Sequence, residues 1–135
     1  MITTKELAKA KDLMTKGVIA ISRHTPVLDA AKILIENHIT GLPVVNHDME
    51  LIGILSEKDI LRLYYDPSCG TDKSVEDFMT EKVLSFDENI SMAEICDCLI
   101  NNSFRRVLIT ANGKLVGIIT RRDLIRYIIE LSEKN

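Results

Sequence analysis

Two segments of the sequence place a hydroxyl residue three positions before an aspartate, each time directly after an apolar run that contains glycine. Ser56 and Asp59 form the first pair, and Thr120 and Asp123 form the second. At a helix start, the hydroxyl caps exposed backbone N–H groups and the carboxylate points back toward the same turn. The free N–H groups and the helix dipole also favour an anion there. The two pairs therefore predict two related binding sites.

The elements that must position these pairs occur twice along the chain. Residues 53–62 correspond to residues 117–126, and residues 12–15 correspond to residues 77–80 at an almost constant offset. Each copy reads strand, helix, strand, strand, helix in about 60 residues, a length that is marginal for independent folding. We therefore predict an α+β fold in which two βαββα repeats pack through their sheets with pseudo-twofold symmetry.

The internal boundary is predicted at the stretch rich in helix and strand breakers, residues 66–72. It gives a first repeat with a leading helix at residues 1–68 and a second repeat at residues 69–135. The leading helix is expected over residues 4–14, followed by a short buried strand at residues 18–21. A hairpin is expected from residues 42–45 and 51–55, and the second copy has a compact Asn-Gly turn at residues 111–113.

The bulk composition is that of an ordinary soluble protein. The 135 residues are 46% hydrophobic and 27% charged, with a formal net charge of -3. This charge argues against a broad electrostatic surface for nucleic acid. No apolar run approaches the roughly 18 residues that a membrane span needs, and the polar N-terminus lacks a signal-peptide core. We expect a cytoplasmic protein without membrane association.

The residues most often used for metal binding or catalysis are not grouped in the sequence. Cys69, Cys96 and Cys98 have spacings that suit neither a zinc site nor a redox pair, and the three histidines share no common spacing. No nucleophile stands near a plausible base, and no glycine-rich phosphate loop is present. The sequence therefore predicts a protein that is not an enzyme and has no metal site.

The order, duplication and spacing of these segments resemble a tandem pair of CBS domains, the Bateman module. The segments that carry the resemblance are residues 12–15, 39–45, 53–62, 77–80 and 117–126. It covers residues 11–131 and identifies the chain as similar to stand-alone CBS domain-containing proteins. The resemblance implies a regulatory module that senses energy or metabolite state. Such a module binds an adenosyl ligand, commonly AMP, ADP, ATP or S-adenosylmethionine, in the cleft between the repeats, and has no obligatory cofactor.

The resemblance also implies roles for individual residues. Asp59 and Asp123 would hold the ribose hydroxyls, and Ser56 and Thr120 would position ribose or phosphate. The remaining expected ligand-binding residues are those around the adenine and beside the two helix starts: Val18, Ile19, Val83, Leu84, Thr40, Gly41, Arg105, Arg106 and Arg121. The family further implies a homodimer that acts on a separate effector protein.

The two predicted sites differ in charge. The second copy offers arginines, Arg105, Arg106 and Arg121, whereas the first copy places Glu57 beside Ser56, where a carboxylate repels phosphate. We expect the Asp123 site to take a phosphorylated ligand and the Asp59 site to be weak, empty or suited to a less charged ligand.

Other interpretations remain open at this stage. Each hydroxyl and aspartate pair could be helix capping alone, worth about 1 kcal/mol. The chain could be a ligand-free module for dimerisation or protein interaction, or it could prefer S-adenosylmethionine. Nucleic-acid binding is a third interpretation, against which the net charge argues. It would need Arg105, Arg106, Arg121, Arg122 and Arg126 on one surface, and a steep salt dependence of binding would separate it from a nucleotide pocket.

Overall fold

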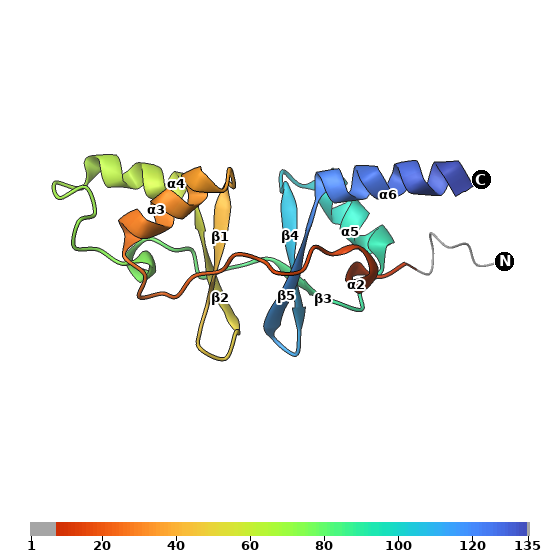
Figure 1. Cartoon of the computed structure of the whole chain (residues 1–135), viewed down its shortest axis with the longest axis horizontal. Coiled ribbons are helices and arrows are strands. Elements are labelled where there is room, and N and C mark those ends of the chain that lie inside the picture. The colour runs from red at the N-terminus through yellow and green to blue at the C-terminus, as the bar shows by residue number, and fades with distance from the viewer. Residues whose placement is uncertain (1–7, 135) are drawn as a thin grey trace. The chain divides into compact units, whose positions relative to one another are not determined.

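The computed structural model describes residues 8–134, which form two compact units (Figure 1). The repeat-1 unit comprises Ile19–Val83. The repeat-2 unit comprises the residues from Leu84 onward together with the N-terminal segment that ends at Val18. Helices and strands are mixed in both units, as predicted for an α+β fold.

The repeat-1 unit is built on a two-stranded antiparallel sheet. In chain order its elements are α3 (Val27–Glu36), β1 (Gly41–Val45), β2 (Leu51–Ser56), α4 (Glu57–Leu61), η1 (Arg62–Tyr65) and η2 (Val75–Asp77). Ala30 and Leu34 of α3 pack against Leu42 and Val44 of β1 in a buried apolar cluster. This packing fixes β2, and with it the start of α4.

The repeat-2 unit contains a three-stranded sheet in the order β3-β4-β5. Its elements are α2 (Ala10–Leu13), β3 (Ser85–Asp87), α5 (Met92–Asn101), β4 (Arg106–Ala111), β5 (Lys114–Thr120) and α6 (Arg121–Lys134). β3 runs parallel to β4, and β4 is antiparallel to β5. The predicted compact turn joins β4 to β5, and Asn112 and Gly113 both have positive φ, as this turn type requires.

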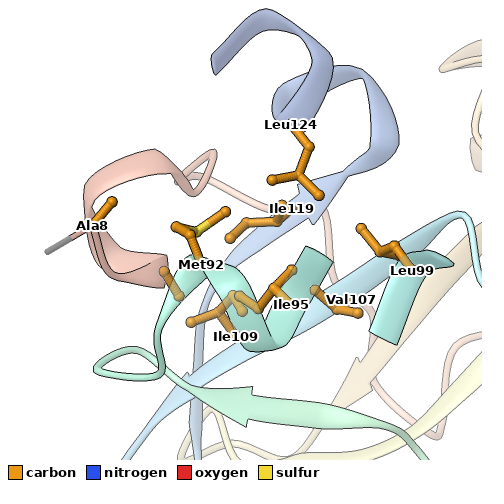
Figure 2. Packing of buried hydrophobic residues seen from close by; sticks show 9 residues of the cluster. Ala8, Met92, Ile95, Leu99, Val107, Ile109, Ile119 and Leu124 are labelled. Atoms are coloured by element: carbon orange, nitrogen blue, oxygen red, sulfur yellow. The ribbon is translucent and has the colours of Figure 1, made fainter. Parts of the chain in front are cut away.

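The core of the repeat-2 unit joins α5 and α6 to the sheet. In Figure 2 the side chains of Ile95, Val107 and Ile109 gather between α5 and β4, and Ile119 and Leu124 come from β5 and α6. Ile95, Ile109 and Ile119 are fully buried. Burying an aliphatic side chain of this size contributes about 1.5–3 kcal/mol. The cluster therefore holds the end of β5 and the start of α6 in fixed positions.

Each unit includes a segment that precedes the other repeat in the sequence. Thr15 forms an antiparallel bridge with Ile118 of β5, and Thr80 forms one with Ile54 of β2. The predicted boundary between residues 68 and 69 divides the chain by sequence order, whereas packing places residues 8–18 with the second repeat and residues 69–83 with the first. The duplicated stretches at residues 12–15 and 77–80 share the pattern Asp-x-Met-Thr. The first of these Asp-x-Met-Thr segments packs in the repeat-2 unit and the second in the repeat-1 unit.

The predicted strand at residues 18–21 is wrong, because only Ile21 pairs with the sheet, through an isolated parallel bridge to Val44. The chain passes from the repeat-2 unit into the repeat-1 unit between Val18 and Ile19. Only the end of residues 18–21 therefore lies beside β1. Residues 4–7 of the expected leading helix lie outside the described residues, and the described part forms the single turn α2. None of the helices described over residues 8–134 has the length and apolarity needed to span a membrane.

Candidate functional site

The second helix start has the capping geometry that the sequence predicts. Thr120 ends β5, and Asp123 is the third residue of α6. The Thr120 N–H donates to Asp123 Oδ2 at 2.8 Å, and the Thr120 hydroxyl donates to the same oxygen at 3.0 Å. The Asp123 N–H donates to Thr120 Oγ1 at 3.3 Å. These bonds fix the carboxylate at the helix start, as in a capping box.

The first helix start repeats the arrangement. The Ser56 N–H and hydroxyl each donate to Asp59 Oδ2 at 2.9 Å, and the Asp59 N–H donates to Ser56 Oγ at 3.4 Å. Both predicted caps are therefore confirmed. In each repeat one carboxylate oxygen is used by the cap, and the other, Oδ1, is left for other partners.

In both repeats an arginine three residues after the aspartate contacts that second oxygen. Arg62 Nη1 lies 3.2 Å from Asp59 Oδ1, and Arg126 Nη1 lies 3.4 Å from Asp123 Oδ1. The Asp59 side chain is 3% exposed and the Asp123 side chain is 14% exposed. Sequence reasoning aligned the two arginines but gave them no role, although their spacing of three from each aspartate is typical of a helical ion pair. The Asp123 carboxylate is the more accessible of the two.

The residues predicted to border each site, at the starts of β1 and β4, lie beside the helix starts. Gly41 stands opposite Ser56 across the β1–β2 pair, and Arg106 stands opposite Thr120 across the β4–β5 pair. The bond from the Glu57 N–H to the Thr40 carbonyl corresponds to the bond from the Arg121 N–H to the Arg105 carbonyl. The structure thus brings the corresponding predicted residues of each repeat together.

Arg121 has a structural role that the sequence did not indicate. Its Nε donates to the Phe104 carbonyl at 3.0 Å, and its Nη2 donates to the Asn102 carbonyl at 3.4 Å. These bonds fasten the loop after α5 to the start of α6. A phosphate would have to compete with them for the guanidinium of Arg121.

The four residues expected around an adenine flank the two points where the chain changes unit. Val18 and Leu84 belong to the repeat-2 unit, which contains Asp123, whereas Ile19 and Val83 belong to the repeat-1 unit, which contains Asp59. Ile19 is 41% exposed and Leu84 is 39% exposed, while Val18 and Val83 are half-buried. Apolar side chains with this accessibility are available to cover a flat base.

A pocket of about 440 Å³ lies against Asp123 in the repeat-2 unit. It is lined by residues of the N-terminal segment and of α6: Ala8, Asp12, Leu13, Asp123, Arg126, Tyr127 and Glu130. Of these, only Asp123 was predicted as a site residue. The N-terminal residues could not be assigned to this position from the sequence, because they precede the first repeat and pack on the second.

The described part of the chain contains no group of three or more His, Cys, Asp or Glu side chains that could hold a metal ion. Cys69, Cys96 and Cys98 all have free thiols. The chemistry available at the two helix starts is therefore hydrogen bonding by carboxylate, hydroxyl and backbone groups, together with the charges of nearby arginines.

Comparison with protein families gives a match to the CBS domain model over residues 10–66 and again over residues 75–130. The chain is 32% identical to the Bacillus subtilis protein YlbB over 119 residues, which covers 87% of this chain and 80% of that protein. It spans only 41% of the length of the Methanocaldococcus jannaschii protein MJ1225, to which it is 26% identical over 116 residues.

Two similar solved structures contain adenosyl ligands. The complex of Arabidopsis thaliana CBSX2 with AMP matches with a TM-score of 0.81 and 30% identity, covering 92% of this chain and 98% of that one. The CBS domain pair of protein MJ0100, in complex with 5′-methylthioadenosine and S-adenosyl-L-methionine, matches with a TM-score of 0.74 and 26% identity over 92% of this chain and 98% of that one.

Proposed function

Because this chain belongs to the CBS domain family and carries two CBS domains, we propose that it is a regulatory module that binds an adenosyl ligand and acts on a separate protein. The observation that carries the proposal is the duplicated helix start, where one oxygen of a carboxylate is held by the cap and the other contacts an exposed arginine. The proposal assigns the chain no catalytic step. Its output is a change in ligand occupancy that a partner can detect.

Adenosine is the part that the ligands of the two similar complexes have in common. A ribose has two neighbouring hydroxyl donors that a carboxylate can accept, and an adenine suits apolar side chains with nearby backbone polar groups. Asp123 and Asp59 therefore take the ribose in this proposal, and Val18, Ile19, Val83 and Leu84 take the base. The caps would form even if the protein bound no ligand, so a binding measurement is needed to distinguish an adenosyl site from helix capping alone.

The two sites are unequal in this proposal, and the Asp123 site binds the phosphorylated ligand. α6 has 14 residues and α4 has five, so the dipole that favours an anion is better developed at the second helix start. Arg105 and Arg106 border the second site, whereas exposed Glu57 follows Ser56 in the first. AMP, ADP and ATP are accordingly the favoured ligands of the Asp123 site.

We also propose that two copies of the chain pair through helical surfaces present in both repeats. The large apolar side chains that are exposed at matching positions are Ile35 and Ile100, Leu61 and Ile125, Tyr64 and Ile128, and Tyr65 and Ile129. Each is between 51% and 85% exposed. Large apolar side chains exposed at corresponding positions of both repeats favour an interaction surface. A surface present in both halves of one chain suits a symmetric pairing with a second chain.

Thermal melting with added ligand tests the adenosyl proposal. A ligand at 100 times its dissociation constant stabilises a protein by about 2.7 kcal/mol, which for a chain of this length raises Tm by several degrees. We expect that rise with AMP, ADP or ATP, and a smaller one with S-adenosylmethionine. Identical melting with all four ligands at millimolar concentration, and no heat in a titration, would contradict the proposed function.

A further inference from the structure

The Asp123 carboxylate has limited capacity for a ribose while Arg126 is in place. Oδ2 already accepts two hydrogen bonds from Thr120, and Oδ1 accepts one from Arg126. A carboxylate oxygen accepts about two hydrogen bonds, one for each lone pair. One acceptor position therefore remains, whereas the two neighbouring hydroxyls of a ribose need two. The second position becomes available when Arg126 leaves Oδ1.

The contact between Arg126 and Asp123 can be broken at small cost. Its length is 3.4 Å and the arginine side chain is 68% exposed, so solvent competes for both groups. Exposed ion pairs of this kind contribute little to stability. Both residues line the 440 Å³ pocket, so a ligand can reach them. The guanidinium is thus held by a weak contact on the oxygen that a ribose would use.

We propose that Arg126 is a positioning residue that occupies Asp123 Oδ1 in the empty site and is displaced by the ribose hydroxyls. The inference rests on the proposed adenosyl binding and adds a competition to it. Arg126 keeps the carboxylate paired and oriented when no ligand is present. It also lowers ligand affinity by the free energy of the contact that the ribose must replace.

In the first repeat, Arg62 and a ribose would compete for Asp59 in the same way, and the arginine is held more strongly. Arg62 Nη1 approaches Asp59 Oδ1 to 3.2 Å, and the Asp59 side chain is only 3% exposed. An ion pair around a buried carboxylate is less screened by water than one at the surface, and it is harder to replace. Displacement is therefore easier at Asp123 than at Asp59, which gives a second reason for unequal sites.

Titration calorimetry with adenosine tests the competition. Adenosine has the ribose hydroxyls but no charge, so changes in binding cannot come from attraction between ligand and arginine. The variant is Arg126→Gln, and the matched control is Arg122→Gln, which removes the same charge from the same helix at a residue whose guanidinium is not paired with the Asp123 carboxylate in the described structure. We expect Arg126→Gln to lower the Kd for adenosine about two- to fivefold relative to the control.

The salt dependence of the same titration separates competition from a merely structural role. Raising NaCl from about 0.05 M to about 0.5 M screens an exposed ion pair. In the wild-type protein, adenosine should bind more tightly at high salt because its competitor is weakened. In Arg126→Gln this salt effect should be absent, and in Arg122→Gln it should persist.

The possible results are distinct. If the wild-type protein binds adenosine and Arg126→Gln binds it equally or more weakly than Arg122→Gln does, the competition is overturned and the proposed function stands. If all three proteins bind neither adenosine nor AMP, there is no ribose site, and both proposals are overturned. Tighter binding by Arg126→Gln together with loss of the salt effect supports the competition.

Discussion

The Sδ atom of Met14 lies 2.5 Å from the position that a Cβ atom on Gly117 would occupy. Real Cβ atoms do not approach another atom so closely, so the methionine and any side chain at position 117 exclude each other. The equivalent pair in the repeat-1 unit is Met79 and Gly53, at 2.9 Å. The methionine of each Asp-x-Met-Thr segment is thus seated on the glycine of a strand from the other repeat.

Gly117→Ala is expected to destabilise the protein by about 1–3 kcal/mol, because the new methyl group overpacks the site under Met14. Urea unfolding measures the change. A double-mutant cycle with Met14→Ala provides the control, since removing the methionine makes room for the methyl group. Gly117→Ala should then cost clearly less in the Met14→Ala background. An equal cost in both backgrounds would show that the two residues do not interact.

The loop after η1 should lose stability in acid through Asp66. Its carboxylate accepts hydrogen bonds from the N–H groups of Ser68 and Gly70 and from the Ser68 hydroxyl. Desolvation acts to raise the pKa of Asp66, but these hydrogen bonds and the charge of Lys73 outweigh it and lower the pKa. A lowered folded-state pKa contributes stability above the unfolded value of about 3.9, and this contribution is lost as pH falls through the folded-state pKa.

The stability advantage of the wild-type protein over Asp66→Asn is therefore expected to be full near neutral pH and to shrink below about pH 4. Urea unfolding over a pH series measures it. Asp72→Asn serves as the control because it removes a carboxylate from the same loop without touching the N–H groups of Ser68 and Gly70. A constant difference between wild type and Asp66→Asn down to pH 2.5, about a unit and a half below the ordinary pKa, would rule out this role.

Dimerisation should be sensitive to charge on the exposed apolar helix surfaces. Ile128 is 55% exposed on α6, and Tyr64 is 84% exposed on η1. A glutamate at either position would have to be buried in the interface, so Ile128→Glu and Tyr64→Glu are expected to sediment as monomers at concentrations where the wild type is dimeric. Lys114→Glu, at the exposed first residue of β5, is the control. Monomeric wild-type protein, or dimeric variants, would contradict the proposed interface.

The sequence predicted local features well where one residue type allows few alternatives. The caps at Ser56 and Thr120 followed from a hydroxyl three residues before an acid, and the Asn112-Gly113 turn followed from two residues that tolerate positive φ. The family and the α+β repeat followed from the duplicated order of segments. These features depend on short stretches of chain, and such stretches can be interpreted without knowing the packing.

The sequence failed where the outcome depends on distant packing. Residues 18–21 have the apolar composition of a strand, but the chain changes unit there and only Ile21 pairs with β1. Asp12 and Leu13 lie beside Asp123 because the N-terminal segment packs on the second repeat, and no local sequence pattern encodes this packing. The pairing of Arg126 with Asp123 was visible as a spacing of three, but its position on the remaining carboxylate oxygen needed coordinates.

Calorimetric titration of AMP into Asp123→Asn measures whether the Asp123 carboxylate binds the ribose hydroxyls of an adenosyl ligand. Asp77→Asn is the matched control, because Asp77 accepts the same capping bonds from Ser74 at η2 and is not one of the predicted site residues. A hydrogen bond to a charged group is worth about 1.5–3 kcal/mol, so Asp123→Asn should bind AMP about 10- to 100-fold more weakly than wild type. Asp77→Asn should bind it normally, and 2′,3′-dideoxyadenosine monophosphate should bind the wild type weakly. Equal AMP affinity in both variants and the wild type, with no penalty for the dideoxy ligand, would contradict the account.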